Sequence, residues 1–412
     1  MSKLVECVPN ISDGQNQEVI QAVLDAMTAI PGVTLLDHES DKDHNRSVIT
    51  IIGKPDAVSN GAFECIKKAS ELIDLTKHKG EHPRMGATDV CPFIPIKDVT
   101  MEECVELAKA LAKKVAEELK IPVYLYEEAA TRPNRQNLAV VRKGQFEGIR
   151  DEIKTNPDRK PDFGPNDVHP TAGIMAIGAR MILIAFNVNL DSSDVTYAKT
   201  IGKAIRFKDG GFRYTKAMGF ALKERNISQV SMNMVNYVGT PLYRTFEFVK
   251  NEAMHFGISV IGSEIVGLTP LKALSDAVEH AFRVPEITDE MIDWDDKNNS
   301  LEFTIEVAKF SSELGNQIIN ALSENTGGFK GVKANVSNKT LTIKVDDAKS
   351  TPMHRLFYTT LSETEHFGTT ITKMSFEKIP IHVLVTAAVF YLRIENFDIG
   401  QILEVKLREK VQ

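Results

Sequence analysis

The sequence predicts an α+β fold made of one unit, strand–helix–strand–strand–helix–strand, which occurs three times along the chain. In the first third, strand-like runs occupy 4–8, 33–37, 47–53 and 91–96. Helical patterns fill 17–30 and 55–73 between them. The same order of elements returns after residue 180 and again after residue 300. This order is the split βαβ, ferredoxin-like pattern, in which helices cover one face of a mostly antiparallel sheet.

Local signals justify the elements of the first unit. The first helix carries apolar residues at helical spacing, namely Val19, Val23, Met27 and Ile30. Pro55 suits the first turn of the second helix, because it lacks the N–H that would remain unbonded there. The run 47–53, SVITIIG, is rich in β-branched residues, which favour strands. Thr100 and Glu103 form a capping box for a further helix over 101–119, and a strand at 122–126 follows.

The later elements follow the same rules. The second unit is predicted to contain strands at 181–190, 212–220, 228–236 and 259–261 and helices at 193–207, 241–256 and 270–282. The third is predicted to contain strands at 301–307, 331–336, 340–345 and 370–376 and helices at 309–323, 353–364 and 382–394. Residues 337–339 (SNK) read as the turn of a hairpin.

These units predict three domains, 1–180, 181–295 and 296–412. A chain of 412 residues is too long for one hydrophobic core. Residues 128–172 form a long, polar connection with little periodicity, and connections of this length are often functional. Residues 284–300 are acidic, poor in apolar residues, and are predicted to be a linker.

Composition excludes several classes of function. The net charge of −7 argues against nucleic acid as a partner, because that would require a basic face. The chain start lacks the apolar core of a signal peptide, and no apolar run reaches the roughly 18 residues that span a membrane. The four cysteines form no C-x-x-C pair. We therefore expect a reduced, cytoplasmic protein with buried thiols and no membrane partner.

Residues 75–96, LTKHKGEHPRMGATDVCPFIPI, are the strongest candidate for a reactive loop. Charged residues and two histidines are concentrated beside a run that reads as a buried strand. His78 and His82 are four residues apart and would share one face of a helix, as a metal site requires. Gly80 and Pro83 argue against a helix, so we predict no metal. Taken alone, either histidine could also be an ordinary surface residue.

Several segments spread over 1–283 together resemble one family. They are LVECVPNIS (4–12), NRSV (45–48), GEHPRMGATDVCPFIPI (80–96), ELKIPVYLYEEA (118–129), PDFGP (161–165), AFNVNL (185–190) and VGLTPLKAL (266–274). In these segments the chain resembles glutamate formiminotransferase, including the N-terminal half of formiminotransferase–cyclodeaminase. The resemblance implies two subdomains that form a cleft and a protein that is a homo-oligomer. It also implies transfer of the formimino group of N-formimino-L-glutamate to N5 of tetrahydrofolate, a co-substrate, in histidine degradation.

The resemblance also implies site residues. The family's catalytic histidine falls on His82, and a family aspartate falls on Glu39, which is one methylene longer. The family's folate-binding segment falls on Phe163, Gly164, Pro165, Asn166, Asp167, Val168, His169, Pro170, Thr171 and Ala172. In this segment Asp167 and His169 are polar where apolar or aromatic side chains would stack better on a pterin.

The chemistry of this transfer suits an imidazole. N5 attacks the amidine carbon, and glutamate's amino group leaves well only after it is protonated. A histidine with a pKa near 6.5 can take the first proton and supply the second. Glu39 would stabilise the cationic amidine and orient the imidazole. We predict that Asn10 hydrogen-bonds substrate and that Arg84 binds a substrate carboxylate, since a guanidinium can pair with both oxygens.

Two alternatives remain. The same fold could accept N-formylglutamate, a neutral donor, or could bind folate without turnover. Residues 301–412 do not resemble the cyclodeaminase, because their pattern is α+β and they lack its Pro-Gly-Gly-Gly run. They are predicted to form a third domain that mediates oligomerisation or regulation, or one that is a second enzyme.

Overall fold

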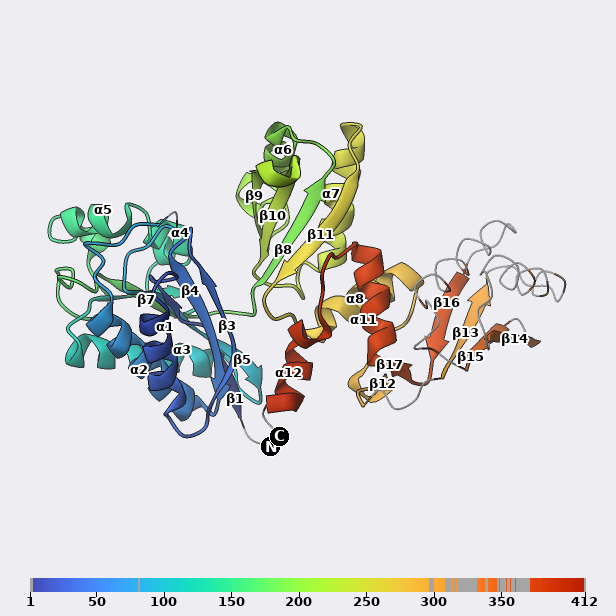
Figure 1. Ribbon diagram of the computed structural model, residues 1–412, viewed down its shortest axis with the longest axis horizontal. Helices are drawn as coiled ribbons and strands as arrows, with labels where there is room; N and C mark the ends of the chain where they lie inside the picture. Colours follow the sequence, from blue (N-terminus) through green and yellow to red (C-terminus); the bar gives the residue numbers. More distant parts are fainter. Residues whose placement is uncertain are drawn as a thin grey trace. The chain divides into compact units, whose positions relative to one another are not determined.

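The computed structural model describes residues 3–80, 82–295, 300–307, 332–337, 340–346 and 371–410, with single positions between the later ranges. The chain forms two compact units (Figure 1). The first comprises Met1–Ile182 with Leu407–Gln412, and the second comprises Leu183–Lys406. Both units mix helices and sheets, so the predicted α+β class is confirmed. The division into three domains stays a prediction.

The first unit is built on a seven-stranded sheet. Its strands are β1 (Leu4–Cys7), β2 (Asn10–Ile11), β3 (Val33–Asp41), β4 (Arg46–Gly53), β5 (Thr88–Lys97), β6 (Val123–Glu127) and β7 (Met175–Ala179). β1 and β2 both pair with β4 on one side and with β5 on the other, and β3 pairs with the outer side of β4. Beyond β5 come β7 and then β6, both in parallel pairs.

Three helices pack against this sheet through a single apolar core. They are α1 (Gln17–Thr28), α2 (Pro55–Leu72) and α3 (Met101–Glu118). Pro55 occupies the first turn of α2, and the Thr100–Glu103 capping box of α3 is present. The thiols of Cys7, Cys65, Cys91 and Cys104 are free and buried, as predicted.

Two features of the first unit were not predicted. β7, MAIGA, contains small residues that give no strand periodicity, but it lies fully buried between β5 and β6. The long connection contains two short helices, α4 (Leu138–Val141) and α5 (Gln145–Glu152). Phe146 is buried, and Val141 and Ile149 belong to a second, smaller apolar cluster with Tyr124 and Tyr126 of β6. These few apolar anchors are too widely spaced to show as a helical pattern.

The second unit begins with a four-stranded antiparallel sheet in the order β11-β8-β10-β9. The strands are β8 (Ile184–Leu190), β9 (Thr215–Leu222), β10 (Ile227–Met234) and β11 (Val260–Val266). The helices are α6 (Val195–Ile205), α7 (Leu242–His255) and α8 (Leu271–Phe282). All were predicted, but β11 extends five residues beyond the predicted end at Ile261 because polar Ser263 and Glu264 interrupt its apolar alternation.

A second four-stranded antiparallel sheet, in the order β14-β15-β13-β16, completes this unit. Its strands are β13 (Leu301–Val307), β14 (Val332–Ser337), β15 (Thr340–Val345) and β16 (Ile371–Phe376), and the predicted hairpin is β14–β15. The predicted helix at 382–394 is α11 (Ile381–Leu392), and an unpredicted helix, α12 (Leu403–Lys410), follows. The helices predicted at 309–323 and 353–364 lie mostly outside the described residues.

The predicted linker at 284–300 is wrong for its first half. Val284, Ile287 and Ile292 are buried, and β12 (Ile292–Asp293) pairs in parallel with β17 (Ile379–Pro380). Because most residues of this segment are acidic or polar, its three buried apolar residues formed no recognisable pattern in the sequence.

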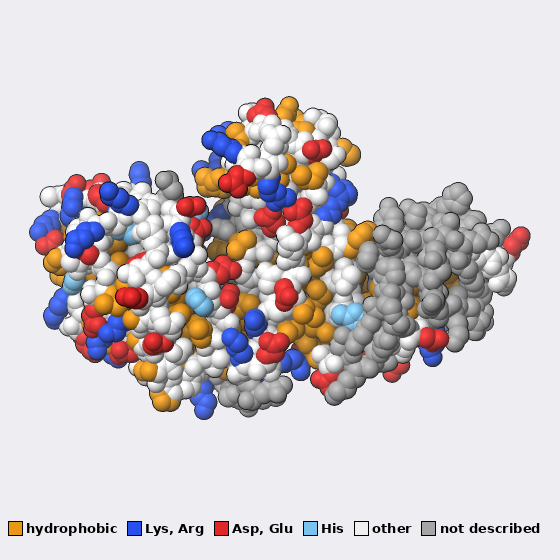
Figure 2. Space-filling model, viewed as in Figure 1, with side chains coloured by type: hydrophobic (Ala, Val, Ile, Leu, Met, Phe, Trp, Pro, Cys, Tyr) orange, Lys and Arg blue, Asp and Glu red, His pale blue; other side chains and the backbone are white. Residues whose placement is uncertain are grey.

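The distribution of charged side chains on the surface is consistent with the negative net charge of the chain. On the face shown in Figure 2, acidic and basic side chains are interspersed over the described residues without a continuous basic patch. In the described part of the chain, no helix is both long and apolar enough to cross a membrane.

Candidate active site

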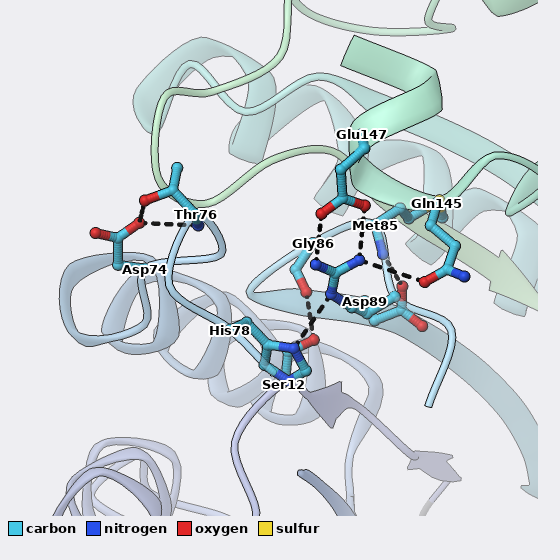
Figure 3. A network of polar contacts seen from close by, with 10 residues as sticks. Ser12, Asp74, Thr76, His78, Met85, Gly86, Asp89, Gln145 and Glu147 are labelled. Carbon is cyan, nitrogen blue, oxygen red and sulfur yellow. Dashed lines mark hydrogen bonds and ion pairs between the residues drawn. The ribbon is translucent and has the colours of Figure 1, made fainter. Parts of the chain in front are cut away.

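The loop that carries His82 is held by the main chain on both sides. Ser12 Oγ donates a hydrogen bond of 2.7 Å to Gly86 O (Figure 3). Met85 O accepts from Ile174 N at 3.0 Å, and Ala87 N donates to Ala172 O at 2.9 Å. A Cβ at Gly86 would stand 2.4 Å from Ile174 O, so only glycine permits this approach. The loop is therefore fixed to the segments that lead into the neighbouring strands.

Arg84 locks the same loop onto α5. Its guanidinium donates to both carboxylate oxygens of Glu147, at 2.9 and 2.7 Å, and to Gln145 Oε1 at 3.3 Å. Arg84 is 9% exposed, whereas Glu147 is largely accessible. The hydrogen bond from Arg84 is the main reason that the pKa of Glu147 lies below its ordinary value. Figure 3 shows Glu147 and Gln145 on one side of this cluster and His78 on the other.

His78 has a structural part in this cluster. Its Nδ1 accepts a hydrogen bond of 3.2 Å from Arg84 Nε, so the ring proton resides on Nε2. That nitrogen then donates to Asn45 O at 3.0 Å. His78 thus connects the loop to the β3–β4 turn and is not available as a metal ligand through either nitrogen.

The β3–β4 turn presents Arg46 beside Asn10. Asn45 takes the left-handed conformation that ends the turn, with φ 48°. Its side chain accepts from Gly14 N at 2.9 Å and donates to Lys79 O at 3.0 Å. Next along β4, Arg46 Nε donates to Asn10 Oδ1 at 3.0 Å, and Nη2 contacts the same oxygen. The predicted substrate-binding Asn10 therefore also positions a guanidinium.

A second guanidinium comes from the long connection. Arg142, which ends α4, donates from Nη2 to Asp89 Oδ2 at 2.5 Å. Asp89 lies at the start of β5, is 2% exposed, and accepts from Met85 N at 2.8 Å through its other oxygen. The Nε of Arg142 is buried and has no hydrogen-bond partner among the described residues. This donor is a candidate for a bound oxygen atom.

Burial and these two cations together keep His82 neutral. Burial lowers the pKa of His82 most, and the charges of Arg46 and then Arg142 lower it further, from 6.5 to about 3. The imidazole is therefore neutral near pH 7 and can accept a proton. An imidazolium formed in this buried, cationic site would be more acidic than an ordinary one and would give its proton up readily.

Glu39 lies on β3, opposite Val48 of β4, and is exposed. Partial desolvation, and next the charge of Asp37, raise the pKa of Glu39, while Arg46 lowers it. No hydrogen bond joins Glu39 to His82 within the described residues. The charge of Arg46 lowers the pKa of both Glu39 and His82, so Arg46 couples the two side chains electrostatically.

The predicted folate segment reaches the His82 loop at its C-terminal end. Phe163 O accepts from Val123 N at 2.9 Å, which ties the start of the segment to β6. Gly164, Pro165, Asn166 and Asp167 are exposed. His169 Nδ1 accepts from Ala172 N at 3.0 Å, and Ala172 O in turn binds the loop at Ala87. Burial lowers the pKa of His169, so this ring stays a neutral acceptor that shapes the turn.

Sequence reasoning missed three charged groups. Arg46 belongs to the motif NRSV. This motif contributed to the family resemblance, but no role was assigned to its arginine. Arg142 had no local signal, since it is one of many cations in the long connection. Glu6, in the motif LVECVPNIS, is 5% exposed, and burial raises its pKa to about 7 against the opposing charge of Arg180. Its position between hydrophobic neighbours on β1 could have marked it.

No group of three or more His, Cys, Asp or Glu side chains is placed to hold a metal ion within the residues that the structure describes.

The N-terminal subdomain of the formiminotransferase domain matches residues 4–180, and the formiminotransferase domain matches residues 185–299. A glutamate formimidoyltransferase of Streptococcus pyogenes is 56% identical over 286 residues, which cover 69% of this chain and 95% of that protein. The chain belongs to the formiminotransferase family.

Two further relatives delimit the family part of the chain. A glutamate formimidoyltransferase of Thermoplasma acidophilum is 48% identical over 283 residues, covering 68% of this chain and 93% of that protein. A formimidoyltransferase-cyclodeaminase of Mus musculus is 48% identical over 282 residues, which cover 67% of this chain but only 52% of the mouse protein. The formiminotransferase match therefore carries no information about a deaminase.

Proposed function

We propose that this formiminotransferase-family protein is a glutamate formimidoyltransferase. It would transfer the formimino group of N-formimino-L-glutamate to N5 of tetrahydrofolate in histidine degradation. The observation that carries the proposal is the 56% identity to the Streptococcus pyogenes protein of that name, over 95% of its length. The family match over residues 4–180 includes the His82 loop, Arg46 and Arg142.

His82 is proposed as the proton carrier. The lone pair of N5 attacks the amidine carbon and forms a tetrahedral intermediate. His82, neutral because of its low pKa, accepts the N5 proton. The resulting imidazolium gives this proton to the nitrogen that glutamate retains. The bond between that nitrogen and the formimino carbon then breaks, so no net proton remains on the enzyme.

Arg46 and Arg142 are proposed to bind a carboxylate of the donor or of folate. Two guanidiniums lie near His82, and the buried Nε of Arg142 has no partner among the described residues. A bound carboxylate would satisfy that donor and reduce the positive charge at the imidazole. Arg84, the predicted carboxylate ligand, already pairs with Glu147 and would have to exchange that partner for the substrate.

Glu39 is proposed to favour the cationic amidine over a neutral formyl donor, with Asn10 as a further hydrogen-bonding group. A carboxylate can stabilise an amidinium, although the exposure of Glu39, its raised pKa and its neighbour Arg46 reduce this effect. Comparing Glu39→Gln with the parent enzyme on both donors tests this assignment. A selective loss with N-formimino-L-glutamate is expected, and an equal loss with N-formylglutamate would reject it.

We also propose that the folate pterin binds along Phe163–Ala172, and that each formiminotransferase subdomain has a ferredoxin-like core. The strand orders β3-β4-β1/β2-β5 and β11-β8-β10-β9 support this description of the cores. The reaction belongs in the cytoplasm, where the free thiols predicted from the sequence would stay reduced.

The decisive experiment is turnover by the purified full chain. With both substrates present, mass spectrometry should detect 5-formimino-tetrahydrofolate and one equivalent of glutamate. Equilibrium binding of tetrahydrofolate without any product would instead favour a folate-binding protein that lacks activity. Product formed only from N-formylglutamate would identify the neutral donor.

A further inference from the structure

Residues 269–292 and 379–402 have the same local structure. α8 and α11 each contain 12 residues. Each follows an extended proline, Pro270 or Pro380, and each ends at an arginine with φ 54°, Arg283 or Arg393. The spacing between these counterparts is constant, because 380 − 270 and 393 − 283 both equal 110. A left-handed arginine is uncommon, so two at matched positions indicate a repeated design.

The sheets that precede these helices also match. We call the elements from β8 to β12 the second block and the elements from β13 to residue 402 the third block. With strands numbered within each block, both antiparallel sheets have the order fourth, first, third, second. The fourth strand, β11 or β16, lies at the edge of its sheet in both cases. The third block therefore repeats the architecture of the second within the described strands.

The two blocks contact one another through reciprocal hydrogen bonds. After α11, Arg393 O accepts from Ser263 N at 2.7 Å, and Arg393 Nη1 donates to Val260 O, both on β11. After α8, Arg283 O accepts from Met374 N at 3.2 Å, and Arg283 Nη1 donates to Ile371 O, both on β16. Equivalent atoms of each arginine thus bind equivalent positions on the other block's edge strand.

In a second pair of contacts, the two blocks again exchange roles. Ile292 of the second block pairs in parallel with Ile379 of the third. Thr269 of the second block forms a parallel bridge with Ile402 of the third. Thr269 corresponds to Ile379 and Ile292 corresponds to Ile402, again 110 residues apart. Some bonds lack a counterpart: Glu395 N donates to Ser263 O, but the matching residue, Pro285, has no N–H. Ser263 Oγ also donates to Leu392 O at 2.6 Å, but the matching residue of β16, Met374, has no hydroxyl.

The helices form the apolar centre of this contact. α8 packs against α11, and the two lie side by side in Figure 1. α11 buries Ile381, Val383, Leu384, Val385, Ala387, Ala388 and Leu392. Tyr391 also donates to Glu247 Oε1 at 3.0 Å, beside the ring of Phe246 on α7.

Contacts that occur twice with their roles exchanged define a two-fold, self-complementary interface. We propose that the face made by β11, α8 and residues 283–292 is a self-association surface of the formiminotransferase part, and that the third block occupies it as a built-in second copy. The partner that fits this surface is the second block of another copy of the chain. In the full chain the surface is filled, so any homo-oligomer must form through another face.

The relatives make a direct test practical. The formiminotransferase domain match ends at residue 299, before β13, and the Streptococcus pyogenes protein is covered to 95% by a match of 286 residues, so a chain without the third block is a natural size in this family. We would compare the full chain with a chain ending at Asp295 by sedimentation velocity. The shortened chain should contain twice as many protomers per particle. If both chains contain the same number while the shortened one remains folded by circular dichroism, the proposal is wrong.

A charge-reversal variant tests whether the proposed surface mediates the association. In the shortened chain, Arg283 of each copy should bind the partner copy's β11 as Arg393 does in the full chain. Arg283→Glu should therefore abolish the doubling, whereas Lys223→Glu, at an exposed turn between β9 and β10, should leave it intact. Doubling that survives Arg283→Glu would place the association elsewhere and reject the proposal.

Shortening could instead prevent folding. For that case a protease site inserted between Asp295 and Ser300 allows the folded full chain to be cut and the C-terminal piece to be removed by gel filtration in mild urea. After return to buffer, the remaining piece should associate in pairs. A piece that stays folded at the original number of protomers would also reject the proposal.

Discussion

The protonation of His82 gives the sharpest prediction, because its environment is cationic as well as buried. The pKa falls from 6.5 to about 3, with burial as the largest cause and Arg46 as the next. One unit of pKa corresponds to about 1.36 kcal/mol, so the fall from 6.5 to about 3 opposes protonation by at most about 5 kcal/mol. Because His82 is not fully buried, solvent screening reduces this value.

The sign of the pH dependence follows from linkage. Between about pH 6.5 and pH 3 the unfolded chain holds a proton on His82 that the folded protein does not. The free energy of unfolding therefore falls as the pH is lowered through this window. At pH 4.5 the unscreened loss is about 2.7 kcal/mol, and we expect about 1–2 kcal/mol after screening.

Urea unfolding at pH 7 and pH 4.5 measures this effect. His82→Asn, which cannot titrate, should lose about 1–2 kcal/mol less than the parent protein on acidification. The proton can also be observed by an NMR titration of the His82 ring. Arg46→Gln should raise the pKa of His82 only partly towards 6.5, since burial remains, whereas Arg150→Gln, which changes an exposed side chain of α5, should not affect it. A parent pKa near 6.5, or a decrease in Arg46→Gln, would refute the electrostatic reasoning.

Three further predictions concern the loop and its supports. Asp89→Ala should lower the free energy of unfolding by about 3–5 kcal/mol in urea, because it leaves a buried guanidinium unpaired, whereas exposed Asp151→Ala should cost less than about 0.5 kcal/mol. Glu147→Gln should cost only about 1 kcal/mol, since Glu147 is half exposed, and a loss above about 3 kcal/mol would contradict this. Its contribution should also fade as the pH drops through the lowered pKa of Glu147. His82→Ala should reduce kcat by about 10²–10⁴-fold with little change in tetrahydrofolate affinity, and a loss below about tenfold would remove it from catalysis.

The sequence predicted elements well where one face is regularly apolar. The spacing of Val19, Val23 and Met27 matches α1, and the capping box at Thr100 marks the start of α3. The prediction failed where burial does not alternate. β7 is buried along its whole length and consists of small residues, and β11 carries polar Ser263 and Glu264 that find partners only in the folded protein. Such positions depend on neighbours distant in sequence, so no local pattern reports them.

The candidate site shows the same limit more strongly. His82 could be found from its motif, but the charges that add to the effect of burial on its pKa come from β4 and from the end of α4. Arg46 reaches the site because Asn10 and Asn45 fix the β3–β4 turn, and Arg142 reaches it because Asp89 begins the neighbouring β5.

Strand register places Arg46 on β4 and Asp89 on β5, and a shift of one residue would turn either side chain to the opposite face of the sheet. A motif can therefore identify the residue that carries the proton, whereas the pKa at which it does so is a property of the sheet. It follows that a relative could keep every residue of the His82 loop and still differ in pH dependence if its turn or its β5 pairing changed.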